Sequence, residues 1–103
     1  MAKVAVVAKM VAVEGKRDAL IEALASLSAA VQSEPGTEIY AMNLDAVDPD
    51  TVWFYELYTD QDALIAHGTS DAMKAAGAAF GELLAGKPEI SFLTPVSAKG
   101  VTL

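Results

Sequence analysis

One segment in the middle of the chain, residues 51–58, constrains the fold most. It consists of Thr, Val, Trp, Phe, Tyr, Glu, Leu and Tyr, with Glu56 as its one charge. Dense β-branched and aromatic residues favour a β-strand. Because side chains alternate between the faces of a strand, one face carries Val52, Phe54, Glu56 and Tyr58, and the other carries Trp53, Tyr55 and Leu57. Both faces are largely apolar, so both need a covering layer.

The residues before this segment predict two more strands and a helix. Residues 3–13 are rich in Val and end at Glu14-Gly15, which favours a strand. Residues 15–33 carry Leu and Val at spacings of four, three and four, which predicts an amphipathic helix that Glu34-Pro35-Gly36 ends. A strand is expected over residues 37–44, followed by a turn at Asp48-Pro49-Asp50.

The residues after it predict two helices and a last strand. Thr59 and Asp62 fit a capping pair for a short helix that Gly68 closes. Thr69-Ser70-Asp71 then caps a second helix, which Gly86-Lys87-Pro88 ends. The apolar stripe of this second helix is expected to contain Met73, Ala76, Phe80 and Leu83 or Leu84. A final strand is predicted over residues 89–96, and Pro95 indicates either a sheet edge or the point where the chain leaves the sheet.

This order predicts one α+β domain over residues 1–103, a ferredoxin-like sandwich with an antiparallel four-stranded sheet and helices on one face. Helices on one face leave the side with Trp53, Tyr55 and Leu57 open. We therefore expect that side to be buried against a second copy, in a homodimer joined through its sheets.

Composition narrows the class of protein. Of 103 residues 53% are hydrophobic, which excludes disorder, and 14 acidic against 7 basic residues make nucleic acid an unfavourable partner. The chain has no Cys and one His, which excludes disulfides and zinc–cysteine sites, and no metal site is expected.

The apolar runs near the start are short and split by Lys9, so we expect no signal peptide, no membrane span and a cytoplasmic location.

Three short motifs carry a resemblance to a known family. Glu34-Pro35-Gly36 followed by Tyr40, then Tyr55-Glu56-Leu57-Tyr58, then Ala63-Leu64-Ile65-Ala66-His67 resemble the antibiotic biosynthesis monooxygenase family. The resemblance extends from about Val4 to Pro95. It implies a ferredoxin-like dimer whose sheets pack face to face, with the C-terminal segment reaching the partner.

The same resemblance implies an activity without a cofactor. In the oxygenases of the family an electron-rich phenolic substrate is deprotonated and itself reduces dioxygen, so the protein supplies an apolar pocket, a base and an oxyanion donor. The Asn, Trp and His of the haem-degrading branch align with Ala8, Tyr58 and Gly77, which disfavours haem degradation. The Asn, Trp and Tyr of the anthrone-oxidising branch align with Phe54, Tyr58 and Leu64, which weakens transfer of that mechanism.

The expected pocket lies between the sheet and the two later helices. His67 is the candidate general base, because the usual pKa of histidine lies near neutrality; a His before a closing Gly is also typical of a helix end. Glu56 is expected to hold His67 or a substrate hydroxyl, or else to cap a helix or pair with a Lys. Tyr58 is the candidate oxyanion donor and Tyr40 the second, and simple packing is the alternative for both.

The candidate substrate-binding residues are Phe54, Tyr40, Asn43, Leu64, Met73 and Phe80. Met73 and Phe80 are equally explained as core residues by their helical spacing, and Asn43 as the end of its strand.

Three functions remain open: a cofactor-independent monooxygenase acting on a quinol, an anthrone or a related hydroxylated aromatic; an isomerase or degradative enzyme acting on a small carbonyl compound; and a dimeric module that only binds an apolar ligand.

Overall fold

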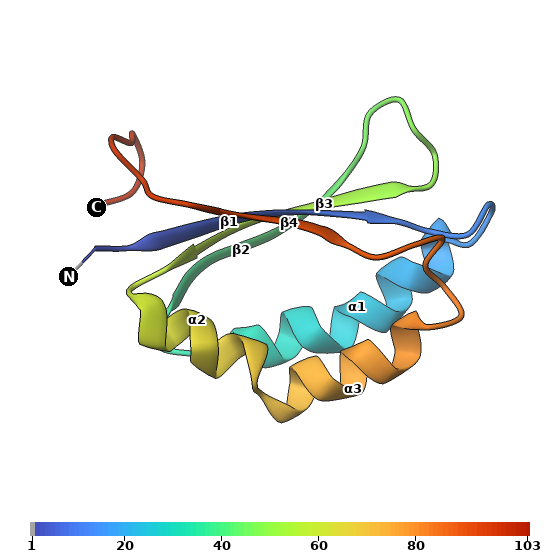
Figure 1. The fold of residues 1–103 in the computed structure, drawn as a ribbon, viewed down its shortest axis with the longest axis horizontal. Coiled ribbons are helices and arrows are strands. Elements are labelled where there is room, and N and C mark those ends of the chain that lie inside the picture. Colours follow the sequence, from blue (N-terminus) through green and yellow to red (C-terminus); the bar gives the residue numbers. More distant parts are fainter. Residues whose placement is uncertain (1) are drawn as a thin grey trace.

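The computed structural model describes residues 2–103 of the chain. The elements are β1 (Val4–Val11), α1 (Arg17–Val31), β2 (Thr37–Leu44), β3 (Thr51–Tyr58), α2 (Gln61–Gly68), α3 (Asp71–Phe80) and β4 (Glu89–Leu93). The strands form one antiparallel sheet in the order β2-β3-β1-β4, and the helices cover one of its faces (Figure 1). The predicted ferredoxin-like α+β fold is confirmed, as is the position of the last strand at an edge.

The core lies between α1 and the middle of the sheet. Leu20, Leu24, Leu27 and Val31 are the buried residues of α1, at the spacing that predicted the helix. They cluster with Val52 and Phe54 of β3. No side chain caps the start of α1, so burial holds the helix in place, at roughly 1.5–3 kcal/mol for each large apolar side chain.

The strand register aligns one row of residues on the helix side of the sheet. Glu56 of β3 lies opposite Val6 of β1 and Tyr40 of β2, and Val6 in turn lies opposite Phe92 of β4. Residues paired across antiparallel strands share a face. The row therefore places one carboxyl and one phenol among apolar neighbours, under the helices.

The cap of α2 differs from the prediction. Asp60 is the N-cap, and its carboxylate accepts a hydrogen bond from the backbone N–H of Ala63 at 2.8 Å. Thr59 instead donates its hydroxyl to Glu38 of β2 at 3.0 Å. The predicted Thr59–Asp62 capping pair is therefore wrong by one position, because the cross-strand carboxylate takes the threonine hydroxyl.

The ends of α3 and β4 also differ from the prediction. Ser70 caps α3 as expected, accepting from the N–H of Met73 at 3.1 Å, but the helix ends at Phe80. The backbone beyond it bonds to the end of β1 instead, with Val13 N–H donating to the Leu83 carbonyl and Ala85 N–H to the Val11 carbonyl, each at 2.8 Å. Strand β4 ends at Leu93, before Pro95.

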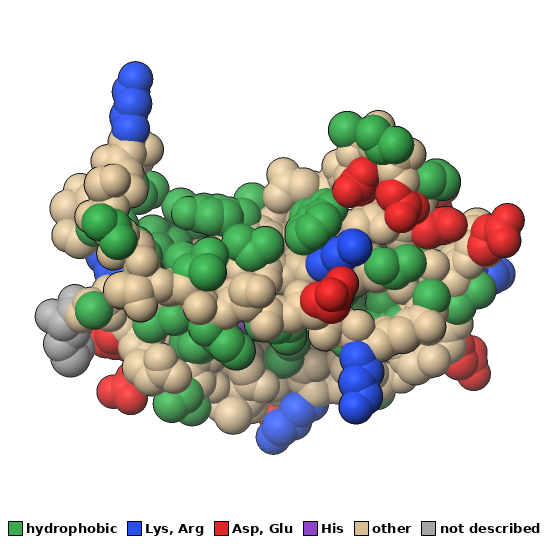
Figure 2. All heavy atoms as spheres, turned by 45° about the horizontal axis from the view of Figure 1, so that its top comes forward, with side chains coloured by type: hydrophobic (Ala, Val, Ile, Leu, Met, Phe, Trp, Pro, Cys, Tyr) green, Lys and Arg blue, Asp and Glu red, His purple; other side chains and the backbone are tan. Residues whose placement is uncertain are grey.

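The outer face of the sheet is apolar but only partly open. Apolar side chains gather there between the C-terminal loop and the β2–β3 hairpin (Figure 2). Tyr55 and Leu93 are each 45% exposed, whereas Leu57 is only 1% exposed. Leu57 lies opposite Ala5 and Ile39, at the end of the sheet beside which the C-terminal loop rises (Figure 1). The prediction that Leu57 forms part of an open patch is therefore wrong.

Lys3 ties the C-terminal loop to this end of the sheet, since its ammonium donates to the carbonyl of Thr102 and to Glu38. None of the helices formed by residues 2–103 is long and apolar enough to cross a membrane.

Candidate active site

A small apolar pocket lies between the sheet and the helices. Its volume is about 150 Å³, and its walls include Val6, Phe54, Leu64 and Met73. At one side it reaches β4, where Ile90 and Phe92 border it. Phe92 is 65% exposed, and β4 is an edge strand, so this side forms the mouth.

Three polar side chains border the pocket: Tyr40, Glu56 and His67. His67 lies in the last turn of α2 and is only 5% exposed. The centroid of its ring lies 5.2 Å from that of Tyr40 and 5.5 Å from that of Tyr58. The three rings therefore form one cluster at the end of the pocket where α2 meets the sheet.

Glu34 is the hydrogen-bond partner of His67. Its Oε1 atom lies 2.9 Å from Nδ1 of His67 and also accepts the hydroxyl of Thr37 at 2.8 Å. An ionised carboxylate only accepts hydrogen bonds, so this contact favours the tautomer with the proton on Nδ1. In the neutral ring Nε2 is then unprotonated and able to act as a base.

A close contact between the α1–β2 loop and α2 brings these two residues together. A Cβ atom on Gly36 would overlap the side chain of Ala63, and the Gly36 carbonyl accepts from the N–H of Thr59 at 2.9 Å. Ala63 lies one helical turn before His67, on the same side of α2. Only a glycine at position 36 lets the loop approach closely enough to place Glu34 against the histidine.

Glu56 lies on the same pocket but binds a different partner. It is 7% exposed, and Tyr58 donates its hydroxyl hydrogen bond to the Glu56 carboxylate. Burial raises the pKa of Glu56 above its ordinary value, while the Tyr58 hydrogen bond and the charge of His67 oppose that rise. Burial therefore favours the protonated form of this carboxyl, one that can donate a proton or a hydrogen bond. The predicted pairing of Glu56 with His67 is not found, because Glu34 binds that ring. Neither a helix cap nor a Lys is the partner of Glu56 among the described residues, since its carboxylate is bound by Tyr58.

The two tyrosines have different places. Tyr40 borders the pocket and packs against Phe54, with ring centroids 5.0 Å apart. Tyr58 is fully buried behind Glu56 and does not border the pocket. Burial raises the pKa of both phenols, and the charge of Glu56 raises both further. Both therefore stay protonated and can donate a hydrogen bond through O–H, and Tyr40 is the one that borders the pocket.

Four of the six predicted substrate-binding residues border the pocket: Phe54, Tyr40, Leu64 and Met73. Asn43 does not. It lies opposite Trp53, on the outer face, and its amide donates to the carbonyls of Ala41 and Trp53 at 3.2 and 3.3 Å. Phe80 does not either, because it packs into the core with α1 and borders a separate hollow near Gly86.

Sequence reasoning missed several residues of the site. Glu34 is part of the signal that ends α1 and of a motif shared with the family, but it is not among the predicted site residues, although a carboxylate in that loop also offers a partner for a histidine. Ile90 and Phe92 of β4 were not assigned to the pocket, although alternation along the strand puts both on the helix side.

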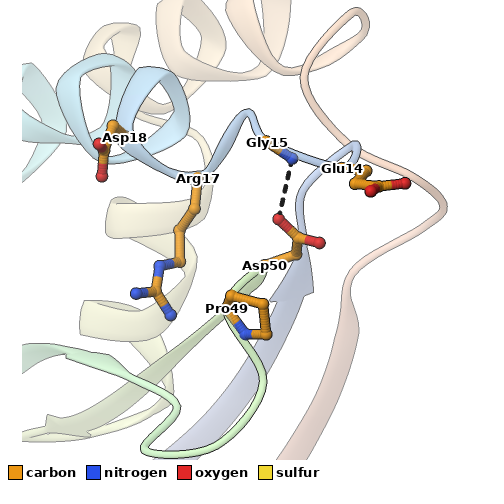
Figure 3. A pocket seen from close by; sticks show the side chains of 6 residues that line it. All are labelled: Glu14, Gly15, Arg17, Asp18, Pro49 and Asp50. Carbon is orange, nitrogen blue, oxygen red and sulfur yellow. Dashed lines mark hydrogen bonds between the residues drawn. The ribbon is translucent and has the colours of Figure 1, made fainter.

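Residues 2–103 contain no group of three or more His, Cys, Asp or Glu side chains that could hold a metal ion. A larger hollow of about 550 Å³ lies elsewhere, between the β1–α1 and β2–β3 loops (Figure 3). Two of its polar side chains, Asp50 and Arg17, bind the loops themselves. Asp50 accepts from the N–H of Gly15 at 3.1 Å, as Figure 3 shows, and Arg17 donates to the carbonyl of Asp48 at 3.0 Å. The small apolar pocket is thus the better candidate for chemistry.

Comparisons with known proteins agree with this architecture. A candidate antibiotic biosynthesis monooxygenase from Caulobacter crescentus is 34% identical, with 93% of this chain and 92% of that chain aligned and a TM-score of 0.88. A protein from Shewanella oneidensis is 31% identical, with 94% of each chain aligned and a TM-score of 0.88. A Mycobacterium tuberculosis protein is 27% identical over 93% of this chain and 97% of that chain, with a TM-score of 0.86.

A search of curated proteins finds no significant match. Residues 3–79 match the family described as antibiotic biosynthesis monooxygenase. The chain belongs to the antibiotic biosynthesis monooxygenase family.

Proposed function

We propose that this protein is a monooxygenase that oxidises a small hydroxylated aromatic compound with dioxygen, and that His67 is its general base. The observation that carries the proposal is the pairing of Glu34 with His67, which stands at the wall of a mostly apolar pocket. A histidine whose Nδ1 is held by a carboxylate presents Nε2 as a proton acceptor. Membership of the family supports the same reaction class.

The size of the pocket favours a substrate with a single ring. Its volume is about 150 Å³, and an apolar protein cavity of about 150 Å³ holds one benzene molecule. A hydroquinone fits this space, whereas a three-ring anthrone would extend beyond the mouth at Phe92. We therefore propose hydroquinones as the substrate class.

The reaction needs only the substrate, dioxygen and proton transfer. His67 accepts a hydroxyl proton, and the resulting phenolate passes one electron to dioxygen. The two radicals combine at a ring carbon to give a peroxide. The peroxide anion takes back the proton from His67. The ring carbon then loses its hydrogen as a proton while the O–O bond breaks, and the outer oxygen leaves as hydroxide, which this second proton converts to water. One hydroquinone and one dioxygen thus give one hydroxyquinone and one water.

Glu56 and Tyr40 have supporting roles in this proposal. One oxygen of Glu56 accepts from Tyr58, which leaves the other for the second substrate hydroxyl. Tyr40 borders the same pocket, and its hydroxyl can donate to the oxygen on which negative charge develops. Tyr58 acts through Glu56 and is a positioning residue.

Oxygen uptake with purified protein tests the proposal. Methylhydroquinone and anthrone are compared, with the rate of the uncatalysed reaction subtracted. We expect protein-dependent uptake with the hydroquinone, less with anthrone, and a fall of about 10²- to 10⁴-fold in His67→Ala. Glu38→Gln, which alters a carboxylate outside the pocket, is the matched control. Equal rates for wild type and His67→Ala would remove His67 from the mechanism.

One observation favours a second candidate, an isomerase acting on a small carbonyl compound. His67 and Glu56 border the same pocket, so one can remove a proton from carbon while the other delivers one, without oxygen. Turnover of a hydroxyketone under nitrogen would support this candidate. Tight binding of aromatic compounds with no turnover in either assay would instead indicate a binding module.

We also propose that the protein is a homodimer joined through the outer faces of its sheets. Tyr55 and Leu93 lie half-exposed on this face, and Lys9 lies over the ring of Trp53, 5.5 Å from its centroid. Such a patch favours a self-complementary contact. Light scattering coupled to size exclusion should give a dimer for wild type, a monomer for Tyr55→Lys, and a dimer for Ile65→Lys, which alters an exposed residue of α2. A monomeric wild type would contradict the proposal.

A further inference from the structure

We propose that Glu34 is a positioning residue that fixes the tautomer of His67 and stabilises the imidazolium formed when His67 takes a proton. The kinetic part of this inference rests on the proposed function. The part that concerns the tautomer does not, because it is a property of the protein without substrate.

His67 lies between two hollows. The first is the apolar pocket; the second has a volume of about 420 Å³ and is bordered by Glu34, Thr37, Asp62 and Ser70 as well as by His67. Glu34 borders only the second hollow, and Glu56 only the first. The Nδ1 edge of the ring therefore faces the hollow that contains the Glu34 carboxylate, and we infer that the edge carrying Nε2 faces the substrate pocket.

This arrangement separates the anion from the place of reaction. The Glu34 side chain keeps 21% of its surface exposed, so it stays partly hydrated on the side of the ring away from the substrate pocket. Its hydrogen bond at 2.9 Å acts on the ring from outside the pocket. Glu34 thus adds no charge to the substrate pocket, while a positive charge formed on the ring has the Glu34 carboxylate directly behind it.

Two contacts hold the Glu34 carboxylate at this distance. The hydroxyl of Thr37 donates to the same oxygen that binds His67, and the overlap that a side chain at Gly36 would have with Ala63 shows how tightly the loop packs on α2. A carboxylate fixed in this way selects one of the two neutral tautomers, because only an Nδ1–H ring can donate to it.

Because His67 is the only histidine of the chain, nitrogen NMR can report on this one ring. Protein labelled with ¹⁵N-histidine, at a pH where the ring is neutral, should show a protonated Nδ1 and an unprotonated Nε2. In Glu34→Ala the ratio of the two tautomers should move toward Nε2–H by about 10- to 100-fold, the effect of one hydrogen bond to a charged group. Glu38→Ala should leave the ratio unchanged.

The wild-type spectrum alone can overturn the inference, whether or not the variant folds. A ring with its proton on Nε2, or an equal mixture of tautomers, would contradict it. An unchanged ratio in folded Glu34→Ala would contradict it as well.

The kinetic measurement distinguishes this inference from the proposed function. If the protein oxidises hydroquinones, Glu34→Ala should lower kcat with little change in KM, since Glu34 does not border the substrate pocket. A change in KM alone would contradict the positioning role. If the expected tautomer is found but no oxidation by any protein is detected, the proposed function fails while the assignment of the tautomer stands.

Discussion

Tyr58 donates its hydroxyl hydrogen bond to the carboxylate of Glu56, two residues earlier on the same strand. Both side chains are buried on the helix side of the sheet, where a carboxyl without a partner is costly. The pair explains how one acidic residue is tolerated in the apolar segment Thr51–Tyr58.

Removing the Tyr58 hydroxyl should leave the Glu56 carboxyl without its donor. We expect Tyr58→Phe to lower the free energy of unfolding by about 1–3 kcal/mol, as is typical for a buried polar group that loses its partner. Urea denaturation measures the change. Tyr55→Phe, on the outer face, is the control and should change it by less than about 0.5 kcal/mol. Equal losses in the two variants would show that the hydrogen bond contributes nothing.

Because the pKa of Glu56 is raised in the folded protein, its contribution to the free energy of unfolding should decrease as pH rises. Burial favours its protonated form in the folded protein, so its contribution is fully present below the ordinary pKa of 4.5 and is lost as pH rises through the folded value. Glu56→Gln cannot ionise, yet its amide oxygen still accepts from Tyr58. The free energy of unfolding of the variant minus that of wild type should therefore increase between about pH 4 and pH 8. A constant or falling difference would contradict the direction of the shift.

The close approach of Gly36 to Ala63 predicts that alanine substitutions at Gly36 and Gly77 change the free energy of unfolding in opposite directions. Gly36→Ala should lower the free energy of unfolding by about 1–3 kcal/mol, because the added methyl overlaps Ala63. Gly77→Ala, in the interior of α3 with nothing near its Cβ position, should instead raise it by about 0.5–1 kcal/mol. Thermal and urea denaturation of both variants check the signs. A Gly36→Ala protein as stable as wild type would refute the tight loop contact.

Neighbouring residues of β4 should have different effects on ligand binding. Phe92 borders the pocket mouth, whereas Leu93 lies opposite Ala5 on the outer face. Calorimetric titration with methylhydroquinone under nitrogen, which prevents turnover, should show weaker binding by about tenfold for Phe92→Ala, the loss of roughly 1.4 kcal/mol of apolar contact. Leu93→Ala should bind as wild type does. The opposite pattern would place the ligand on the outer face.

The sequence was sufficient to predict the elements whose pattern is local. The leucine spacing of residues 15–33 and the aromatic run of residues 51–58 predicted α1 and β3, because the periodicity of each segment records which face is buried. The end of α3 could not be predicted in this way. Leu83 and Leu84 continue the apolar stripe, but the carbonyl of Leu83 accepts from Val13, a contact between distant residues that no local pattern encodes.

In the candidate site, too, local patterns predict some residues, while contacts between distant residues could not be predicted. Strand alternation placed Phe54 and Glu56 on the helix side, and His67 was identified by its residue type. The partner of His67 is Glu34, 33 residues away, and it reaches the ring only because Gly36 packs on α2. Leu57 was expected to be exposed, since alternation assigns a face but does not reveal what covers it.

The most direct test of the proposed monooxygenase reaction is whether an oxygen atom from ¹⁸O₂ appears in the product. Wild type and His67→Gln are incubated with methylhydroquinone under ¹⁸O₂, and the quinone product is analysed by mass spectrometry after subtraction of the uncatalysed reaction. The proposed reaction should place one ¹⁸O atom in each product molecule formed by wild type. Product formation should be lower by about 10²- to 10⁴-fold in the variant. Unlabelled product, or the same labelled yield from both proteins, would contradict it.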